Sequence, residues 1–240
     1  MKRTCILYFC ALALPVAGAA QDLAHLKLLN PDTVKTVVPI LLCPPPEAHT
    51  EIWSNGLEEV RRYYNSNTET DRERAQQEEP TENVCRILSS ECHAGSNSAV
   101  ASLMIDVASD CHTIYTWAKK RPAWAETRPC FAVPGDFPAP LEKPSPNSNS
   151  FPSGHATIEG CLGELLGELY PANRDEIVKR AVQVGRDRMR AGVHFPWDIH
   201  AGERLGEWIA GELLKDPAFR DKLEKAKAQG AAAQNGAANH

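Results

Sequence analysis

The sequence lacks several features that would assign it to common classes of protein. Its 240 residues contain no Cys-x-x-Cys spacing of the kind that binds structural zinc, no glycine-rich nucleotide loop and no internal repeat. Acidic residues outnumber basic ones, 31 to 26, and no stripe of lysine and arginine is present, so nucleic acid is not expected as a partner. We find no convincing strand pattern. Together with the helical spacing of apolar residues described below, this absence of strands predicts an all-α fold with a single domain.

The first twenty residues have the pattern of a secretory signal peptide. Lys2-Arg3 precede a short apolar run, which ends in the small residues Ala17-Gly18-Ala19-Ala20. No cysteine follows to carry a lipid anchor, and no later stretch is apolar enough to cross a bilayer. We expect residues 1–20 to be removed and the mature protein to be periplasmic or secreted. The alternative is an N-terminal membrane anchor.

The remainder of the chain divides into three parts. Residues 21–47 are predicted to form a proline-containing N-terminal arm, extended over the body. Residues 48–218 show helical spacing of apolar side chains and are predicted to form the helical domain. Residues 219–240 are expected to be a disordered C-terminal tail, because the chain is rich in alanine, glutamine, glycine and asparagine there.

The cysteines are expected to be mostly paired. Of the 8 in the sequence, Cys5 and Cys10 lie in the predicted signal peptide. An even number in an oxidising compartment favours disulfides over metal binding, and the sequence does not choose among the pairings. The remaining positions are Cys43, Cys85, Cys92, Cys111, Cys130 and Cys161.

One short stretch carries residues suited to nucleophilic catalysis. His194 follows Arg188 by six positions and precedes Asp198 by four. Pro196 is typical of a first helical position, so Asp198 is expected in the first turn, within reach of His194. A carboxylate on one ring nitrogen orients a neutral imidazole for attack, and a guanidinium suits a phosphoryl group. The alternative is an exposed arginine, a histidine at the edge of the core and an ordinary N-terminal aspartate.

A second stretch predicts an anion-binding helix N-terminus. Ser153, Gly154 and His155 precede a run of apolar residues at helical spacing. Unpaired N–H groups and the helix dipole attract anions there, and glycine permits close approach of a ligand. A plain serine N-cap beside an exposed histidine is the alternative.

Together these motifs resemble the type 2 phosphatidic-acid-phosphatase superfamily, and within it the class A bacterial non-specific acid phosphatases. That signature is Lys-x6-Arg-Pro, then Pro-Ser-Gly-His, then Ser-Arg-x5-His-x3-Asp. Arg128-Pro129, Pro152-Ser153-Gly154-His155 and Arg188-x5-His194-x3-Asp198 match its blocks. The resemblance implies a single-domain bundle of the acid phosphatase and vanadium-dependent haloperoxidase type.

The resemblance also implies roles for these residues. His194 would be the nucleophile that forms a phosphohistidine, Asp198 would orient it, and His155 would protonate the leaving alcohol. Arg128, Arg188 and the N–H groups of Ser153 and Gly154 would hold the phosphate.

Two positions depart from the signature. Arg121 stands where the first block has lysine, and Lys120 or the adjacent Lys119 could serve instead. Asp187 replaces the serine before Arg188 and would oppose a bound phosphate unless it turned onto Arg186 or Arg190.

The sequence thus predicts an exported acid phosphatase that hydrolyses phosphate monoesters without metal or cofactor. It leaves both a monomer and a homo-oligomer open. Its expected partner is a small phosphomonoester, with no nucleic acid and no membrane span in the mature chain. Three alternatives use the same site: a lipid-phosphate phosphatase, a vanadium haloperoxidase and a phosphate-binding protein with weakened catalysis.

Overall fold

All regular structure in the described part of the chain is helical. The structure is a computed structural model, and it describes residues 22–79 and 99–237. The predicted all-α class is confirmed. The predicted signal peptide, Cys85 and Cys92 lie outside the described residues.

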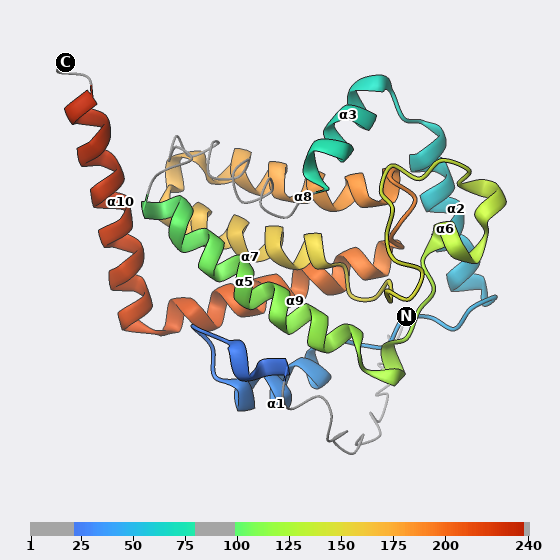
Figure 1. The fold of residues 1–240 in the computed structure, drawn as a ribbon, viewed down its shortest axis with the longest axis horizontal. Helices are drawn as coiled ribbons and strands as arrows, with labels where there is room; N and C mark the ends of the chain where they lie inside the picture. The colour runs from blue at the N-terminus through green and yellow to red at the C-terminus, as the bar shows by residue number, and fades with distance from the viewer. Residues whose placement is uncertain (1–21, 80–98, 238–240) are drawn as a thin grey trace, which may run out of the picture.

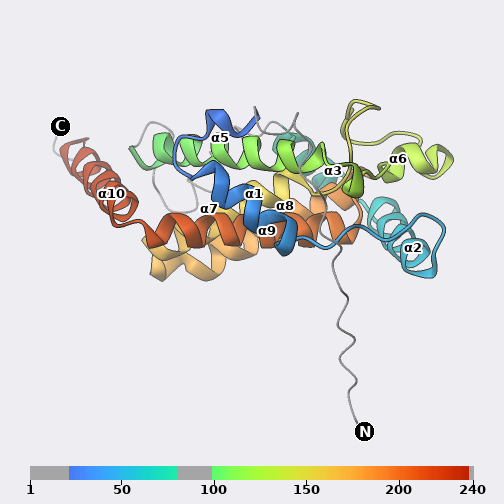
Figure 2. The ribbon, with the colours of Figure 1, turned by 90° about the horizontal axis from the view of Figure 1, so that it is seen from below.

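Four long helices form the body of the molecule. They are α5 (Ala99–Lys119), α7 (Gly154–Leu169), α8 (Arg174–Arg190) and α9 (Pro196–Lys215), and they run lengthwise beside one another (Figures 1 and 2). Helix α7 is central and packs against the other three. Apolar side chains at helical spacing make this core, among them Met104, Val107, Ile114, Ile158, Leu162, Leu165, Leu205 and Ile209.

Helices α7 and α9 approach one another closely at glycines. A Cβ atom on Gly206 would clash with backbone atoms of Thr157 and Cys161, and one on Gly202 would lie 2.5 Å from the carbonyl oxygen of Ser153. The two helix backbones can touch because these positions carry no side chain. This contact brings the N-terminal ends of α7 and α9 together.

Smaller helices gather at that same end of the bundle. They are α2 (Glu51–Asn65), α3 (Glu69–Glu78) and α6 (Pro129–Ala132), and Figure 1 shows them around the ends of the long helices. A second apolar cluster holds α2 and α6 there, and it includes Trp53, Leu57, Val60, Phe137, Val193 and Phe195. Short 3-10 turns at Pro122–Trp124 and Pro134–Asp136 interrupt the otherwise irregular connection between α5 and α7.

The N-terminal arm is not extended, contrary to our prediction. After a 3-10 turn, η2 (Asp22–His25), residues Pro31–Leu41 form helix α1. Asn30 caps this helix by accepting hydrogen bonds from the backbone of its first turn, and proline is tolerated at the first helical position. Val34 and Val38, four residues apart, are buried on one face.

The C-terminal tail is not disordered where the structure describes it. Residues Pro217–Ala237 form helix α10, which lies at the opposite end of the bundle from α2 (Figure 1). Phe219, Leu223 and Ala226 are buried against the core. The apolar spacing of these three side chains outweighs the polar composition that suggested disorder.

A 3-10 turn, η5 (Pro171–Asn173), leads into α8. The described cysteines differ from the expectation of pairing. Cys43, Cys111, Cys130 and Cys161 are unpaired in the part of the chain that the structure describes. Cys111 and Cys161 face one another from α5 and α7 and are fully buried, where a thiol fills the core as a small apolar group.

No helix in residues 22–79 or 99–237 has the length and apolar character needed to cross a membrane.

Two glycines of α9 provide a matched test of the close contact. Gly206→Ala should lower the free energy of unfolding by about 1–3 kcal/mol or more, because its methyl group would meet the backbone of α7. Gly211→Ala, with no atom within 4 Å of its Cβ position, should raise it by about 0.5–1 kcal/mol through helix propensity. Urea denaturation measures both. Equal effects of the two substitutions would contradict the observed packing.

Candidate functional site

Four helix ends converge on the candidate site. Helices α5 and α8 finish there, and α7 and α9 begin there (Figure 1). The irregular connection after α5 crosses the same region. The site is therefore assembled from segments that are far apart in the sequence.

A buried histidine and aspartate form the centre of this site. His194 lies in the turn before α9, and Asp198 lies in the first turn of that helix, as expected. The Oδ2 atom of Asp198 accepts hydrogen bonds from Nδ1 of His194 at 3.1 Å and from the backbone N–H of Phe195 at 2.8 Å. The Ser150 hydroxyl donates to the same oxygen at 2.5 Å. Burial alone would raise the pKa of Asp198, but the hydrogen bond from His194 and the neighbouring groups hold it below its usual value.

Arg128 determines which nitrogen of His194 carries the proton. Its Nη1 lies 3.0 Å from Nε2 of His194 and also donates to the carbonyl oxygen of Val193 at 3.1 Å. A guanidinium can only donate, so Nε2 must be the acceptor and the ring proton must lie on Nδ1, facing Asp198. Burial, and then the charge of Arg128, hold the pKa of His194 well below 6.5. The result is a neutral imidazole with an oriented lone pair on Nε2.

The Ser153-Gly154 segment begins helix α7 as predicted. Ser153 is the N-cap, and its side chain accepts a hydrogen bond from the N–H of Ala156 at 3.4 Å. Its own N–H donates to the carbonyl oxygen of Asp198 at 2.9 Å. The sequence suggested that this N–H would be available to bind a phosphate, but in the structure it already donates to Asp198. Gly154 allows the ring of Tyr115 to lie against the backbone, since a Cβ there would be 2.7 Å from it.

His155 lies in the first turn of α7, under the end of α3. Its Nε2 lies 2.9 Å from the carbonyl oxygen of Glu79, so Nε2 is the protonated nitrogen. Burial, followed by the positive charge of Arg188, lowers the pKa of His155 to about 4. The imidazole is therefore neutral at pH 7 in the resting structure.

The lysine that faces this site is Lys119. Arg121 and Lys120, which were expected to fill the lysine position of the first signature block, do not face it. Its Nζ donates to the carbonyl oxygens of Asn149 and Ser150 at 2.8 and 2.7 Å. Burial, and then Arg128, lower the pKa of Lys119 to about 7. Lys120 is exposed. Arg121 stacks on the rings of Trp117 and Trp124, with its guanidinium carbon 5.3 and 4.9 Å from the ring centres.

Arg188 is fully buried and binds two carboxylates. Its Nη1 contacts Glu142, and its Nη2 donates to Glu78 at 3.1 Å and to the carbonyl oxygen of Ala75 at 2.9 Å. The Glu142 carboxylate also interacts electrostatically with Arg128 and His155. Glu142 therefore lies among the groups that the sequence suggested for holding a phosphate, and its negative charge satisfies them.

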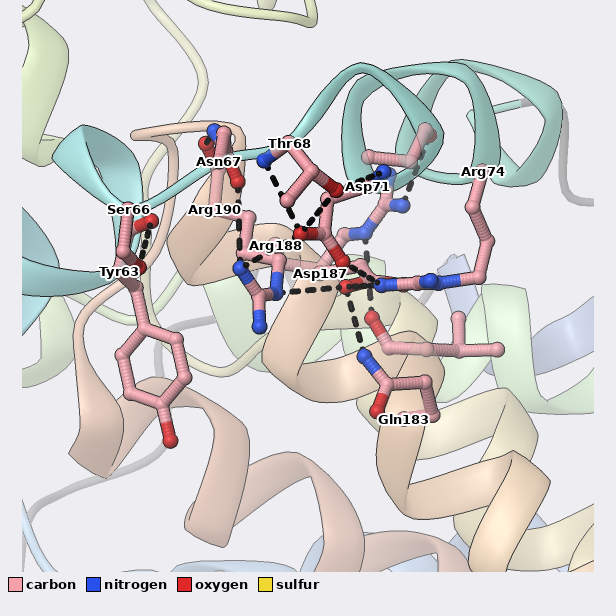
Figure 3. Close-up of polar contacts among 12 residues, drawn as sticks. Tyr63, Ser66, Asn67, Thr68, Asp71, Arg74, Gln183, Asp187, Arg188 and Arg190 are labelled. Carbon is pink, nitrogen blue, oxygen red and sulfur yellow. Dashed lines mark hydrogen bonds and ion pairs between the residues drawn. The ribbon is translucent and has the colours of Figure 1, made fainter.

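Asp187 turns away from this cluster, as the sequence analysis required. Figure 3 shows its carboxylate between two arginines, with Arg74 Nε at 2.6 Å and Arg190 Nε at 3.3 Å. Gln183 donates to it at 2.8 Å. The partner on α3, Arg74, could not be found from the sequence because it lies 113 positions away. Of the two arginines anticipated from the sequence, the carboxylate therefore turns onto Arg190 and not onto Arg186.

The structure thus assembles most of the predicted residues and adds others. His194, Asp198, Arg128, Ser153, Gly154, His155 and Arg188 lie at one end of the bundle, and Arg121 and Lys120 do not take the lysine position. Four further residues contact the site: Glu78, Glu126, Glu142 and Ser150. No motif marks these four, because each comes from the end of α3 or from the irregular connection.

No group of three or more His, Cys, Asp or Glu side chains in the described ranges is arranged to hold a metal ion.

Comparison with known proteins identifies the family of this chain. Residues 100–220 match the PAP2 superfamily, half of the chain, and the protein therefore belongs to that superfamily. The superfamily suggested by the sequence motifs is confirmed.

Several curated relatives are phosphatases. The chain is 34% identical over 80 residues to a non-specific acid phosphatase of Providencia stuartii, covering 33% of this chain and 32% of that protein. It is 28% identical over 114 residues to a non-specific acid phosphatase of Salmonella typhimurium, covering 47% and 46%. It is 36% identical over 61 residues to a lipid A 1-phosphatase of Rhizobium johnstonii, covering 25% of each. The chain thus matches a quarter to a half of the length of these relatives.

A solved structure shares the fold. The transmembrane PAP2-type phosphatidylglycerolphosphate phosphatase from Bacillus subtilis superposes with a TM-score of 0.50 at 22% identity. The superposition covers 80% of this chain and 96% of that one.

The buried Asp187 should matter for stability. Asp187→Asn keeps the shape of the side chain but leaves Arg74 and Arg190 without their shared carboxylate, so it should cost about 3 kcal/mol of unfolding free energy. Glu176→Gln on the same helix is the control, because its contact with Lys179 is 3.9 Å and exposed. In guanidinium denaturation, the midpoint of Asp187→Asn should lie below that of the wild type. The midpoint of Glu176→Gln should equal that of the wild type. An unchanged midpoint in Asp187→Asn would show that the network contributes little.

Proposed function

We propose that this protein is an exported acid phosphatase that hydrolyses phosphate monoesters through a phosphohistidine on His194, without a metal ion. The observation that carries the proposal is the neutral imidazole of His194, held between Asp198 and Arg128 with its Nε2 lone pair directed at a cationic group. Matches to non-specific acid phosphatases support the reaction class. The signal-like residues 1–20 support export.

The first chemical step forms a phosphoenzyme. Nε2 of His194 attacks phosphorus as the bond from phosphorus to the alcohol oxygen breaks, and His155 gives a proton to that oxygen. Asp198 stabilises the positive charge that develops on the ring of His194. In the second step, water attacks phosphorus, His155 accepts a proton from that water, and the bond to Nε2 breaks. Inorganic phosphate is the product.

The cations supply most of the stabilisation in this mechanism. The transition state of phosphoryl transfer spreads negative charge over three oxygens, so positioned cations matter more than covalent chemistry. Arg128, Arg188 and Lys119 are the cations at the site, with the N–H of Gly154 at the start of α7. An incoming phosphate would displace Glu142, which now satisfies Arg188. Breaking the ion pair between Glu142 and Arg188 would reduce the net free energy gained when phosphate binds.

A lipid phosphate is a second candidate substrate. The relatives include a lipid A 1-phosphatase of Rhizobium johnstonii, which supports a headgroup phosphate as an alternative to a small soluble monoester. Both substrates would use the same cations and the same nucleophile.

Rapid-quench trapping of labelled phosphate tests the roles of the two histidines. With nitrophenyl phosphate and EDTA present, His194→Ala should abolish turnover and the phosphoenzyme. His155→Ala should still form the phosphoenzyme, because nitrophenolate leaves without a proton, and should lose roughly 10²–10⁴-fold in rate on alkyl phosphates. Asp198→Asn should bind phosphate normally but phosphorylate slowly.

His200→Ala is the control in this series, because His200 is exposed and its contact is with Glu203 on the same helix. Phosphate trapped by His194→Ala but not by His155→Ala would reverse the two roles. Loss of wild-type activity in EDTA with recovery on adding zinc or magnesium would refute a metal-independent reaction.

The pH dependence follows from the pKa of His155. Since this pKa is lowered to about 4, the protonated acid is present below that pH and is lost as the pH rises. The kcat/KM for an alkyl phosphate should therefore fall, relative to His155→Ala, by about tenfold per unit above that pKa. The ratio of wild type to variant removes the ionisation of the substrate from the comparison. A ratio that stays constant with pH would show that His155 is not the proton donor.

A further inference from the structure

One oxygen of Asp198 lacks a donor in the described part of the chain. All three donors to this carboxylate, from His194, Ser150 and Phe195, reach Oδ2. Oδ1 is buried and receives no hydrogen bond from any N–H or hydroxyl group of residues 22–79 or 99–237. A buried carboxylate oxygen without a donor costs free energy of folding, so a neighbouring group that could donate a proton would stabilise it.

The neighbouring group is the carboxyl of Glu126. It comes from the connection between α5 and α7 and lies in hydrogen-bonding contact with the carboxyl of Asp198. Two ionised carboxylates in a buried contact repel one another, so one of the pair retains a proton. Asp198 already accepts three hydrogen bonds as an anion, which leaves the proton on Glu126.

Trp197 orients this carboxyl. Its indole Nε1 lies 3.0 Å from both Oε1 and Oε2 of Glu126. The indole is itself held in place, because it stacks on Phe195 with ring centres 4.6 Å apart and occupies the space left by Gly56. The Glu126 carbonyl oxygen also accepts the N–H of Ser150 at 2.9 Å. The position of Glu126 relative to the histidine–aspartate pair is therefore defined from two sides.

We propose that Glu126 is a positioning residue for the reaction: it remains protonated and donates its proton to Oδ1 of Asp198, and Trp197 holds it in that orientation. This role rests on the proposed function, since it acts through Asp198 on the nucleophile His194. The hydrogen bond fixes the plane of the Asp198 carboxylate and hence the direction of Nε2. Because Glu126 is neutral, it does so without adding a second negative charge beside the Nδ1 proton of His194.

The surrounding charges are consistent with a neutral Glu126. Burial, and then the charge of Asp198, raise the pKa of Glu126 to about 10. The other charged groups that face the carboxyl pair are Lys119 from the end of α5 and Arg128 from the segment before α6. Lys119 opposes the rise but does not cancel it.

Two substitutions at Glu126 distinguish a donated proton from a charge. Glu126→Gln keeps a donor for Asp198 and an acceptor for Trp197, so kcat on nitrophenyl phosphate should stay within about threefold of wild type, with an unchanged pH profile. Glu126→Ala removes the donor and should lower kcat by about 10- to 100-fold with little change in KM, because binding groups are untouched. Glu126→Met, which keeps the length of the side chain, serves as the donor-free variant if the alanine variant does not fold.

A spectroscopic measurement makes the test independent of turnover. The Nδ1 proton of His194, observed by NMR in protein labelled with ¹⁵N-histidine, should keep its shift in Glu126→Gln and move in the donor-free variant. Glu164→Ala is the control, because Glu164 lies in the C-terminal half of α7, away from the site, and pairs with Arg174 of α8. This variant should change neither kcat nor the resonance.

Each outcome bears on the proposal. A Glu126→Gln variant as impaired as Glu126→Ala, or one whose pH profile is displaced, would overturn it, because an ionised Glu126 would then be required. An unmoved His194 resonance in the donor-free variant would also overturn it. If the wild type hydrolyses no phosphate ester, the proposed function fails, and the resonance still decides whether Glu126 is coupled to His194.

Discussion

The close contact between α7 and α9 is the constraint on which the rest of the structure depends. It exists because Gly202 and Gly206 present no side chain to the backbone of α7. With the helices this close, the N–H of Ser153 donates to the carbonyl oxygen of Asp198 at 2.9 Å. The serine–glycine–histidine turn and the histidine–aspartate pair are thereby joined in one rigid unit, although they are more than forty positions apart in sequence.

The charges at the site form a second level of organisation. Three cationic side chains, Lys119, Arg128 and Arg188, lie at one end of an acidic protein, and buried cations need counter-charges. The structure supplies them from within, through Asp198 and through Glu78 and Glu142 on Arg188. A phosphate would therefore exchange with a carboxylate rather than enter an empty cationic site.

The sequence allowed the helices to be predicted where apolar periodicity was regular. Helical spacing over residues 48–218 predicted a helical domain, and α2, α5, α7, α8 and α9 all form within that range. The arm and the tail were mispredicted for opposite reasons. Prolines in the arm obscured the buried pair Val34 and Val38, and polar composition in the tail obscured Phe219 and Leu223. In both cases burial against a distant part of the chain decided the conformation, and periodicity over one or two turns is too short a signal to show it.

The sequence by itself determined the local geometry of the site. Four-residue spacing after a turn brings Asp198 to His194, and a Ser-Gly-His turn before an apolar stripe begins α7, because these contacts lie within one helical turn. Tertiary structure alone decided that Lys119 faces the site while Arg121 stacks on tryptophans, that Asp187 pairs with Arg74, and that Glu126 and Glu142 approach Asp198 and Arg188. The physical reason is that these contacts depend on the path of the irregular connection between α5 and α7 and on the placement of α3. Neither has a sequence period, and packing against the assembled bundle determines both.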